Sequence, residues 1–197
     1  MVVEGGWRAR AGLLLAALLA AAGAAWAQPA PRLLEQCAAC HGPGGNAQIA
    51  HYPSLAGQPS LFIENQLVIM REGLRVVPSM DPVLKGLSDE AIVGLARHFA
   101  ALPSLPAPAP VRAEAYRLGA QLSKQLLCGT CHLPTYAGQQ QVPRLAGQNE
   151  AYLLQAMKEF RDKPGPGRDT IMASTLRGLP DSDLGHLAHY LARFKPG

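Results

Sequence analysis

The apolar residues of this 197-residue chain recur mainly at helical spacing, in short amphipathic segments. Gly and Ser stand at several of the predicted segment ends, as Gly73 and Ser88 do. The pattern predicts helices over residues 31–40, 60–72, 89–101, 113–127 and 149–162, followed by a last helix that carries Leu184, Leu187, Ala188 and Leu191. Strand patterns are weak, and the seventeen prolines fall largely between the helical segments. The sequence therefore predicts an all-α fold.

The second half of this pattern repeats the first. The segment LAGQ occurs at residues 55–58 and again at residues 145–148. The pair Gly-Leu at residues 86–87 recurs at residues 178–179, in each case just before the last helix of its half. The chain is therefore predicted to be a tandem duplication of one domain.

A proline-rich stretch separates the two copies. Four of the eight residues from Pro103 to Pro110 are proline, a composition typical of a semi-rigid extended connector. We place the first domain at residues 28–102, the linker at 103–111 and the second domain at 112–197.

The amino-terminal segment has the composition of a secretory signal peptide. Arg8 and Arg10 precede an apolar run over residues 11–25, and Ala25-Trp26-Ala27 offers small residues for cleavage after Ala27. An uncleaved membrane anchor is the alternative, although a spanning helix needs roughly 20 apolar residues. We expect residues 1–27 to be removed and the protein to be periplasmic.

Two Cys-x-x-Cys-His motifs use all four cysteines of the chain, CAACH at residues 37–41 and CGTCH at residues 128–132. This motif is the attachment signature of c-type haem. Its spacing lets both thiols reach the two vinyl groups on one porphyrin edge, and the adjacent histidine can bind the iron. Zinc binding or thiol–disulfide chemistry is the alternative use of such a pair. The motifs predict two covalently bound haem c groups, held by Cys37, Cys40, Cys128 and Cys131, with His41 and His132 as iron ligands.

A second axial ligand for each iron is expected to be Met or His. Met80 and Met172 are 92 residues apart, the same separation as the two Gly-Leu pairs, so they occupy equivalent positions in the repeat. Met70 and Met157 align with ordinary apolar residues and are predicted to be core. We therefore predict Met80 and Met172 as ligands, presented from loops, with ligation by a second histidine as the alternative.

The chain has four histidines outside the haem motifs, and none of them aligns with a histidine in the other half of the repeat. They are predicted to be solvated or hydrogen-bonded rather than ligands: His51, His98, His186 and His189.

Two further pairs repeat close to the motifs. Pro53 and Pro143 follow the haem histidines by twelve and eleven residues, so their carbonyl groups are candidates to accept the second ring N–H of each histidine. A turn-forming role is the alternative. Gln58 and Gln148 are expected near the haem edges.

Charge is distributed unequally between the halves. After Ala27, the first half to residue 102 carries five Lys and Arg against six Asp and Glu, and the second carries eleven against seven. A solvated surface explains this simply; the sharper hypothesis is a basic second domain that docks an acidic partner. Nucleic-acid binding is disfavoured because no basic run is interleaved with aromatic residues.

Taken together, these motifs resemble the cytochrome c4 family, dihaem cytochromes of the bacterial periplasm. The resemblance rests on both CxxCH motifs, the LAGQ segments, the Met-containing segments and Gly-Leu-Ser-Asp-Glu at residues 86–90. It implies two class I cytochrome c domains related by a pseudo-twofold axis. It also implies the axial pairs His41 with Met80 and His132 with Met172.

The same resemblance implies a periplasmic electron carrier. Its donors would be a bc1-type complex or a dehydrogenase, and its acceptors a terminal oxidase or reductase. An electron-transfer subunit of a larger oxidoreductase is one alternative, and a dihaem peroxidase-like enzyme is another. The enzyme would need an iron with an open position, which Met ligation at both irons disfavours. Loose association with the inner membrane is compatible with either role.

Overall fold

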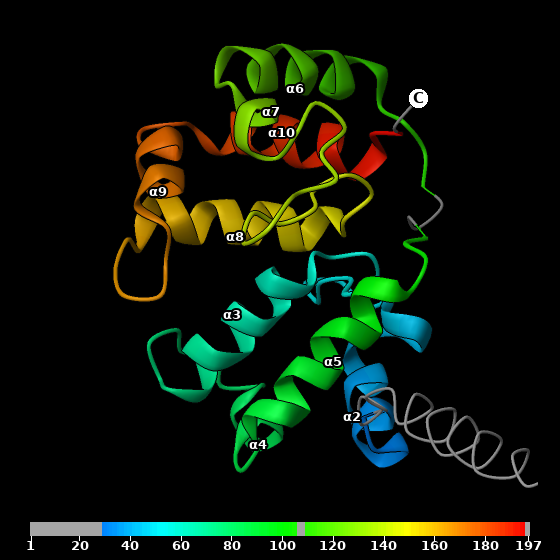
Figure 1. The fold of residues 1–197 in the computed structure, drawn as a ribbon. Helices are drawn as coiled ribbons and strands as arrows, with labels where there is room; N and C mark the ends of the chain where they lie inside the picture. The colour runs from blue at the N-terminus through cyan, green and yellow to red at the C-terminus, as the bar shows by residue number, and fades with distance from the viewer. Residues whose placement is uncertain (1–28, 106–108, 196–197) are drawn as a thin grey trace, which may run out of the picture.

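A computed structural model describes residues 29–105 and 109–195, and within them the chain is helical (Figure 1). The predicted signal peptide, residues 1–27, lies outside the described residues. The helices are α2 (Pro31–His41), α3 (Ser60–Arg71), α4 (Asp81–Leu84), α5 (Asp89–Ala101), α6 (Ala113–Gln125), α7 (Cys128–Cys131), α8 (Glu150–Asp162), α9 (Thr170–Leu176) and α10 (Asp181–Arg193). A short 3₁₀ turn covers Pro43–Gly45. In the described ranges only one isolated β-bridge occurs, so the all-α prediction is confirmed.

Local sequence determines where several helices begin. The Ser88 hydroxyl accepts a hydrogen bond from the Ala91 N–H and caps α5. Asn149 caps α8 in the same way, through the N–H groups of Ala151 and Tyr152. Such caps satisfy backbone donors that a helix leaves unpaired in its first turn.

Two separate hydrophobic cores form, one in each half of the chain. In the first half α3 packs against α5, and in the second half α8 and α6 both pack against α10. Figure 1 shows the two groups of helices one above the other, with an extended stretch leading up to α6. No helix in the described part of the chain has the length and apolar character needed to cross a membrane.

The crossing of α6 and α10 depends on a glycine. A Cβ atom on Gly119 would lie 2.1 Å from the carbonyl oxygen of His186, so only glycine allows the two helices to come this close. In the first half, α2 begins six residues before Cys37, whereas α6 begins fifteen residues before Cys128. The shorter α2 corresponds to α6 in the repeat, but the pair α2 and α5 is not among the closely packed helix pairs of the described chain, whereas α6 and α10 are.

Both ends of the proline-rich linker are held by hydrogen bonds. On the first domain, the Asn46 side chain accepts from the Leu105 N–H (2.7 Å) and donates to the Pro103 carbonyl (3.1 Å). On the second domain, the backbone N–H of Arg112 donates to His189 Nε2 at 3.0 Å. The linker is therefore anchored to the first domain near its beginning and to the second domain near its end.

Replacement of Gly119 by alanine tests the helix crossing. Gly119→Ala is expected to lower the free energy of unfolding by about 1–3 kcal/mol, because the added methyl group meets backbone that cannot move aside. Gly185→Ala in α10 is the control, since a Cβ there has no atom within 4 Å and a helix-interior alanine gains roughly 0.5–1 kcal/mol. Denaturant unfolding followed by circular dichroism measures both. Equal effects at the two positions would contradict the close crossing.

Candidate haem sites

The two CxxCH motifs lie on helical turns that bring each pair of thiols to one face. Cys37 and Cys40 stand in the last turn before the end of α2, and Cys128 and Cys131 begin and end the single turn α7. Residues three apart on a helix are neighbours on its surface. Leu127 has a left-handed backbone (φ 57°) and separates α6 from α7, which redirects the second motif. The four cysteines form no disulfide, and Cys37 and Cys128 are partly buried.

The histidine of each motif is buried and oriented by one hydrogen bond. His41 and His132 are only 7% and 4% exposed. His41 Nδ1 lies 2.8 Å from the Pro53 carbonyl oxygen, and His132 Nδ1 lies 2.8 Å from that of Pro143. The predicted role of the two proline carbonyls is therefore confirmed, and each ring is held with Nδ1–H as the donor.

The other ring nitrogen fits a metal ligand. The buried Nε2 of His41 has no hydrogen-bond partner among the described residues. Burial also lowers the pKa of His41 and of His132, while the bond to the proline carbonyl opposes that shift. The imidazole is thus favoured in its neutral form, with its proton on Nδ1 and a lone pair on Nε2. A buried lone pair of this kind is what a haem iron requires.

Met80 and Met172 each pack against the hydrophobic core of their own domain, as one cysteine of each motif does. Met80 packs against the first core together with Cys37, and Met172 packs against the second core together with Cys128. The expectation that both stand in loops is wrong for Met172, which lies in the first turns of α9 because Asp169 caps that helix through the Met172 N–H. Met80 immediately precedes α4.

The remaining methionines behave as predicted. Met157 is buried in the second core, and Met70 packs against the first. Both stand on long helices among ordinary apolar side chains, on α8 and α3 respectively.

His189, which is predicted to be solvated or hydrogen-bonded, is hydrogen-bonded and buried. It is only 1% exposed, and both of its ring nitrogens have partners. Nε2 accepts from the Arg112 N–H at 3.0 Å, and Nδ1 lies 3.1 Å from Glu150 Oε2. The carboxylate of Glu150 also pairs with the side chains of Arg112 and Arg193, which compensates its burial. His189 is therefore a structural residue.

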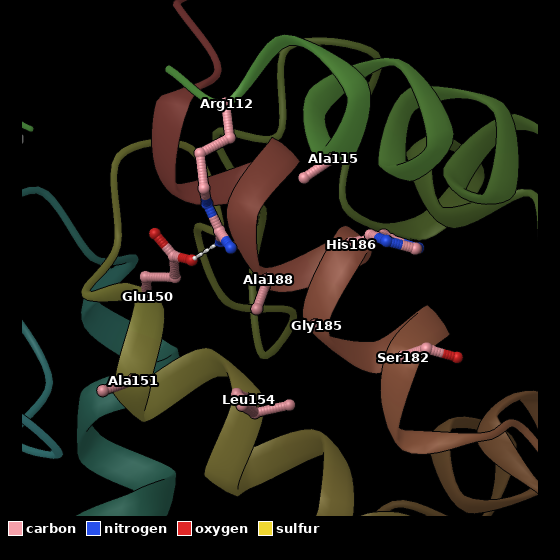
Figure 2. Close-up of a pocket in the computed structure, with 9 residues that line it drawn as sticks. All are labelled: Arg112, Ala115, Glu150, Ala151, Leu154, Ser182, Gly185, His186 and Ala188. Atoms are coloured by element: carbon pink, nitrogen blue, oxygen red, sulfur yellow. Dashed lines mark hydrogen bonds and ion pairs between the residues drawn. The ribbon is translucent and has the colours of Figure 1, made fainter. Parts of the chain in front are cut away.

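A surface pocket of about 480 Å³ opens beside this network, between α6, α8 and α10 (Figure 2). Arg112 and Glu150 form one wall, where the dashed line in Figure 2 marks their ion pair. None of the predicted haem ligands lines this pocket.

Gln58 and Gln148 join the two domains. Gln58 Oε1 accepts from the Arg144 N–H (2.9 Å) and its Nε2 donates to the Arg144 carbonyl (3.0 Å). Gln148 makes the corresponding pair with Ser54, at 2.7 Å and 2.9 Å. The repeat of LAGQ signalled these residues, but only the structure shows that each binds the other domain.

Arg144 also brings charge to this junction. Its guanidinium is about half-buried, and burial lowers its pKa. No carboxylate among the described residues pairs with it. The position therefore favours an anionic group.

Comparison with known proteins places these features in context. A family model described as "Cytochrome C oxidase, cbb3-type, subunit III" matches residues 24–98, and one described as "Cytochrome c" matches residues 116–195. The chain is 31% identical over 173 residues to "Cytochrome c4" of Azotobacter vinelandii, covering 79% of this chain and 82% of the relative. It is 34% identical over 189 residues to "Thiosulfate dehydrogenase electron acceptor" of Thiomonas intermedia, covering 90% and 87%.

A solved structure agrees with these matches. Reduced recombinant cytochrome c4 from Pseudomonas stutzeri superposes with a TM-score of 0.76 at 26% identity, covering 86% of this chain and all of that chain. The prediction of two tandem cytochrome c domains is thereby confirmed.

The loop that presents the Pro143 carbonyl can be tested through Gly138. A Cβ on Gly138 (φ 73°) would lie 2.5 Å from backbone atoms of Pro143 and Arg144, whereas one on Gly178 (φ 74°) meets nothing within 4 Å. Alanine at either position has to adopt a left-handed backbone, at roughly 1–2 kcal/mol. Gly138→Ala is expected to cost about 1–3 kcal/mol more than Gly178→Ala. Guanidinium unfolding of the holoprotein measures the difference, and equal losses would contradict the role given to this loop.

Proposed function

This chain belongs to the cytochrome c4 family and is a dihaem electron carrier, and on that basis we propose how its residues hold the haems and which partners they serve. The observation that carries the site assignment is the orientation of His41 and His132. Each donates its Nδ1 proton to a proline carbonyl, and the buried Nε2 of His41 has no partner in the described part of the chain.

Each domain supplies the groups that hold one haem c. Cys37 and Cys40 form the two thioether links in the first domain, and Cys128 and Cys131 form them in the second. His41 with Met80, and His132 with Met172, are the axial pairs. When bound, the haems supply one-electron exchange between ferrous and ferric iron.

The protein's own residues set the conditions for that exchange. The bond from Nδ1 to the proline carbonyl fixes the tautomer and the ring orientation of each histidine, and it raises the basicity of Nε2. Met80 and Met172 would supply thioether ligands, which raise the reduction potential of a haem that also has a histidine ligand. The buried Nε2 of His41, which would bind the iron, is shielded from water.

We propose that the carrier works in the periplasm. The arginines, apolar run and small residues of segment 1–27 support export, and exported proteins receive covalently attached haem on the outer side of the inner membrane. Its redox partners are a bc1-type complex or dehydrogenase as donor and a terminal oxidase or reductase as acceptor. Loose association with the inner membrane would bring the carrier close to both.

The dehydrogenase among these donors has specific support. A relative described as "Thiosulfate dehydrogenase electron acceptor" is 34% identical and covers 90% of this chain, so a thiosulfate dehydrogenase is a candidate donor. Mixing the oxidised carrier with a thiosulfate dehydrogenase, and separately with a reduced bc1-type complex, compares the two. The faster reduction identifies the donor class.

Replacement of Met172 tests the axial assignment. Met172→Ala is expected to abolish the Met-to-ferric-iron charge-transfer band at one of two haems and to lower the reduction potential of that haem, because the thioether ligand is lost. Both haems should remain attached, since the cysteines are untouched. Met157→Leu is the control: Met157 lies in the core, and the full band should persist. Two unaltered haem spectra in Met172→Ala would contradict the assignment.

The unequal charge of the domains predicts which one docks an acidic partner. Lys85 and Arg177 are exposed and occupy equivalent positions in the repeat, before Gly86 and Gly178. If the basic second domain docks, Arg177→Gln should slow electron exchange with an acidic partner at low salt, and Lys85→Gln should not. Stopped-flow rates over a range of ionic strength measure this. Equal slowing by both variants, or rates independent of salt, would contradict the hypothesis.

A further inference from the structure

The two bonded pairs between the domains attach to the same peptide groups that orient the haem histidines. The Pro53 carbonyl, which accepts from His41 Nδ1, and the Ser54 N–H, which donates to Gln148, belong to one peptide unit. The oxygen of this peptide unit therefore accepts a hydrogen bond from His41 of its own domain. Its N–H donates a hydrogen bond to Gln148 of the other domain.

The second domain reproduces this arrangement with the roles exchanged. The Pro143 carbonyl accepts from His132 Nδ1 at 2.8 Å, and the N–H of Arg144, on the same peptide unit, donates to Gln58 Oε1 at 2.9 Å. Each histidine is thus linked through one peptide group to a glutamine 86 or 94 residues away from that group. The repeat makes the two links equivalent.

The bonds between Gln148 and Ser54 lie away from solvent, and those between Gln58 and Arg144 are partly buried. Gln58 and Gln148 are 5% and 6% exposed, and Ser54 is also buried. Hydrogen bonds in such an environment are not weakened by competing water, and bonds in a chain polarise one another, by on the order of 10–30% per bond. An acceptor on the N–H side of a peptide group increases the negative charge on its carbonyl oxygen.

That charge bears on the haem. A stronger carbonyl acceptor draws the Nδ1 proton of the histidine and raises the basicity of Nε2, which favours ferric over ferrous iron. We propose that each domain lowers the reduction potential of the haem in the other domain: Gln148 acts on His41 through the Pro53–Ser54 peptide, and Gln58 acts on His132 through the Pro143–Arg144 peptide. The inference rests on the axial roles proposed for the two histidines. Gln58 and Gln148 are positioning residues that touch neither iron.

The effect is reciprocal and depends on contact between the domains. Any change that separates Gln148 from Ser54 removes the polarising acceptor from the His41 side, and the same holds for Gln58 and Arg144. The contact between the domains therefore sets both potentials, in addition to holding the domains together.

The test replaces one glutamine at a time in the full-length holoprotein. Methionine has a similar length but offers no amide, so Gln148→Met removes both bonds to Ser54. In the reduced, diamagnetic protein, the NMR signal of the His41 Nδ1 proton is expected to move upfield and that of His132 to stay in place. In a spectroscopic redox titration, the potential of the haem in the first domain is expected to rise. Gln58→Met should give the mirror result, with His132 and the second haem affected.

Controls separate this coupling from a merely structural role. Asn149→Ser keeps a helix-capping side chain but loses the bond from Asn149 Nδ2 to the Ile49 carbonyl, another contact between the domains. It should leave both Nδ1 signals and both potentials unchanged. If either glutamine variant shifts both haems equally, or shifts the haem of its own domain, the proposal is wrong. If the potentials and proton signals of a folded variant match the wild type, it is also wrong.

The two variants are independent tests, because each removes the bonds of one glutamine side chain and leaves those of the other intact. If one of the two variants fails to incorporate haem, the other still tests the proposal, with the roles of the two haems exchanged. The haem content of the wild type, measured as pyridine haemochrome, tests the proposed function separately. Fewer than two haems would overturn that function, whereas two haems with unresponsive histidine protons would overturn only the coupling.

Discussion

A single hydrogen bond, from the ring of a buried histidine to a proline carbonyl, organises each half of this protein. It fixes which nitrogen of His41 or His132 carries the proton, and it leaves the other for a metal. The loop that presents the carbonyl has to approach closely, which in the second domain requires Gly138 at a positive φ. The helical turn that carries the cysteines ends at the same histidine in each domain. The loop that accepts the histidine's hydrogen bond also forms the contact with the other domain.

Sequence alone predicts most of this arrangement because duplication supplies an internal comparison. The longer helices, both motifs and the proline carbonyls follow from spacing and repetition, and the structure has them in place, with the helix predicted over residues 113–127 ending at Gln125. The short helix around Met172 was missed because a seven-residue helix has too little apolar periodicity, and its Asp169 cap is weak evidence by itself. The burial of His189 was missed because its partners, Glu150 and the Arg112 backbone, lie far away in sequence. Gln58 and Gln148 were found as a repeat, but a bond across 86 or 94 residues leaves no local pattern.

The two copies fill their cores differently. In the first domain Gly45 lies against the Phe99 ring, and a Cβ at Gly45 would meet that ring at 2.7 Å. In the second domain Tyr136 occupies the corresponding turn, where its carbonyl accepts from Leu145 and Ala146 as that of Gly45 does from Leu55 and Ala56. The Tyr136 ring stacks edge-on with Tyr190 and Phe194. The second domain thus has an aromatic cluster and a close α6–α10 crossing, whereas the first relies on α3 and α5.

The anchored linker determines how strong the contact between the domains has to be. Only residues 106–109 lie between Leu105, held by Asn46, and Pro110, whose carbonyl accepts from Arg193. The five Cα–Cα steps from Leu105 to Pro110 span at most about 18 Å when fully extended. A tether this short keeps the partner surfaces at an effective concentration on the order of millimolar or above. An interface whose intrinsic dissociation constant lies well below this concentration stays closed most of the time, whereas one with a dissociation constant equal to it is closed only half of the time.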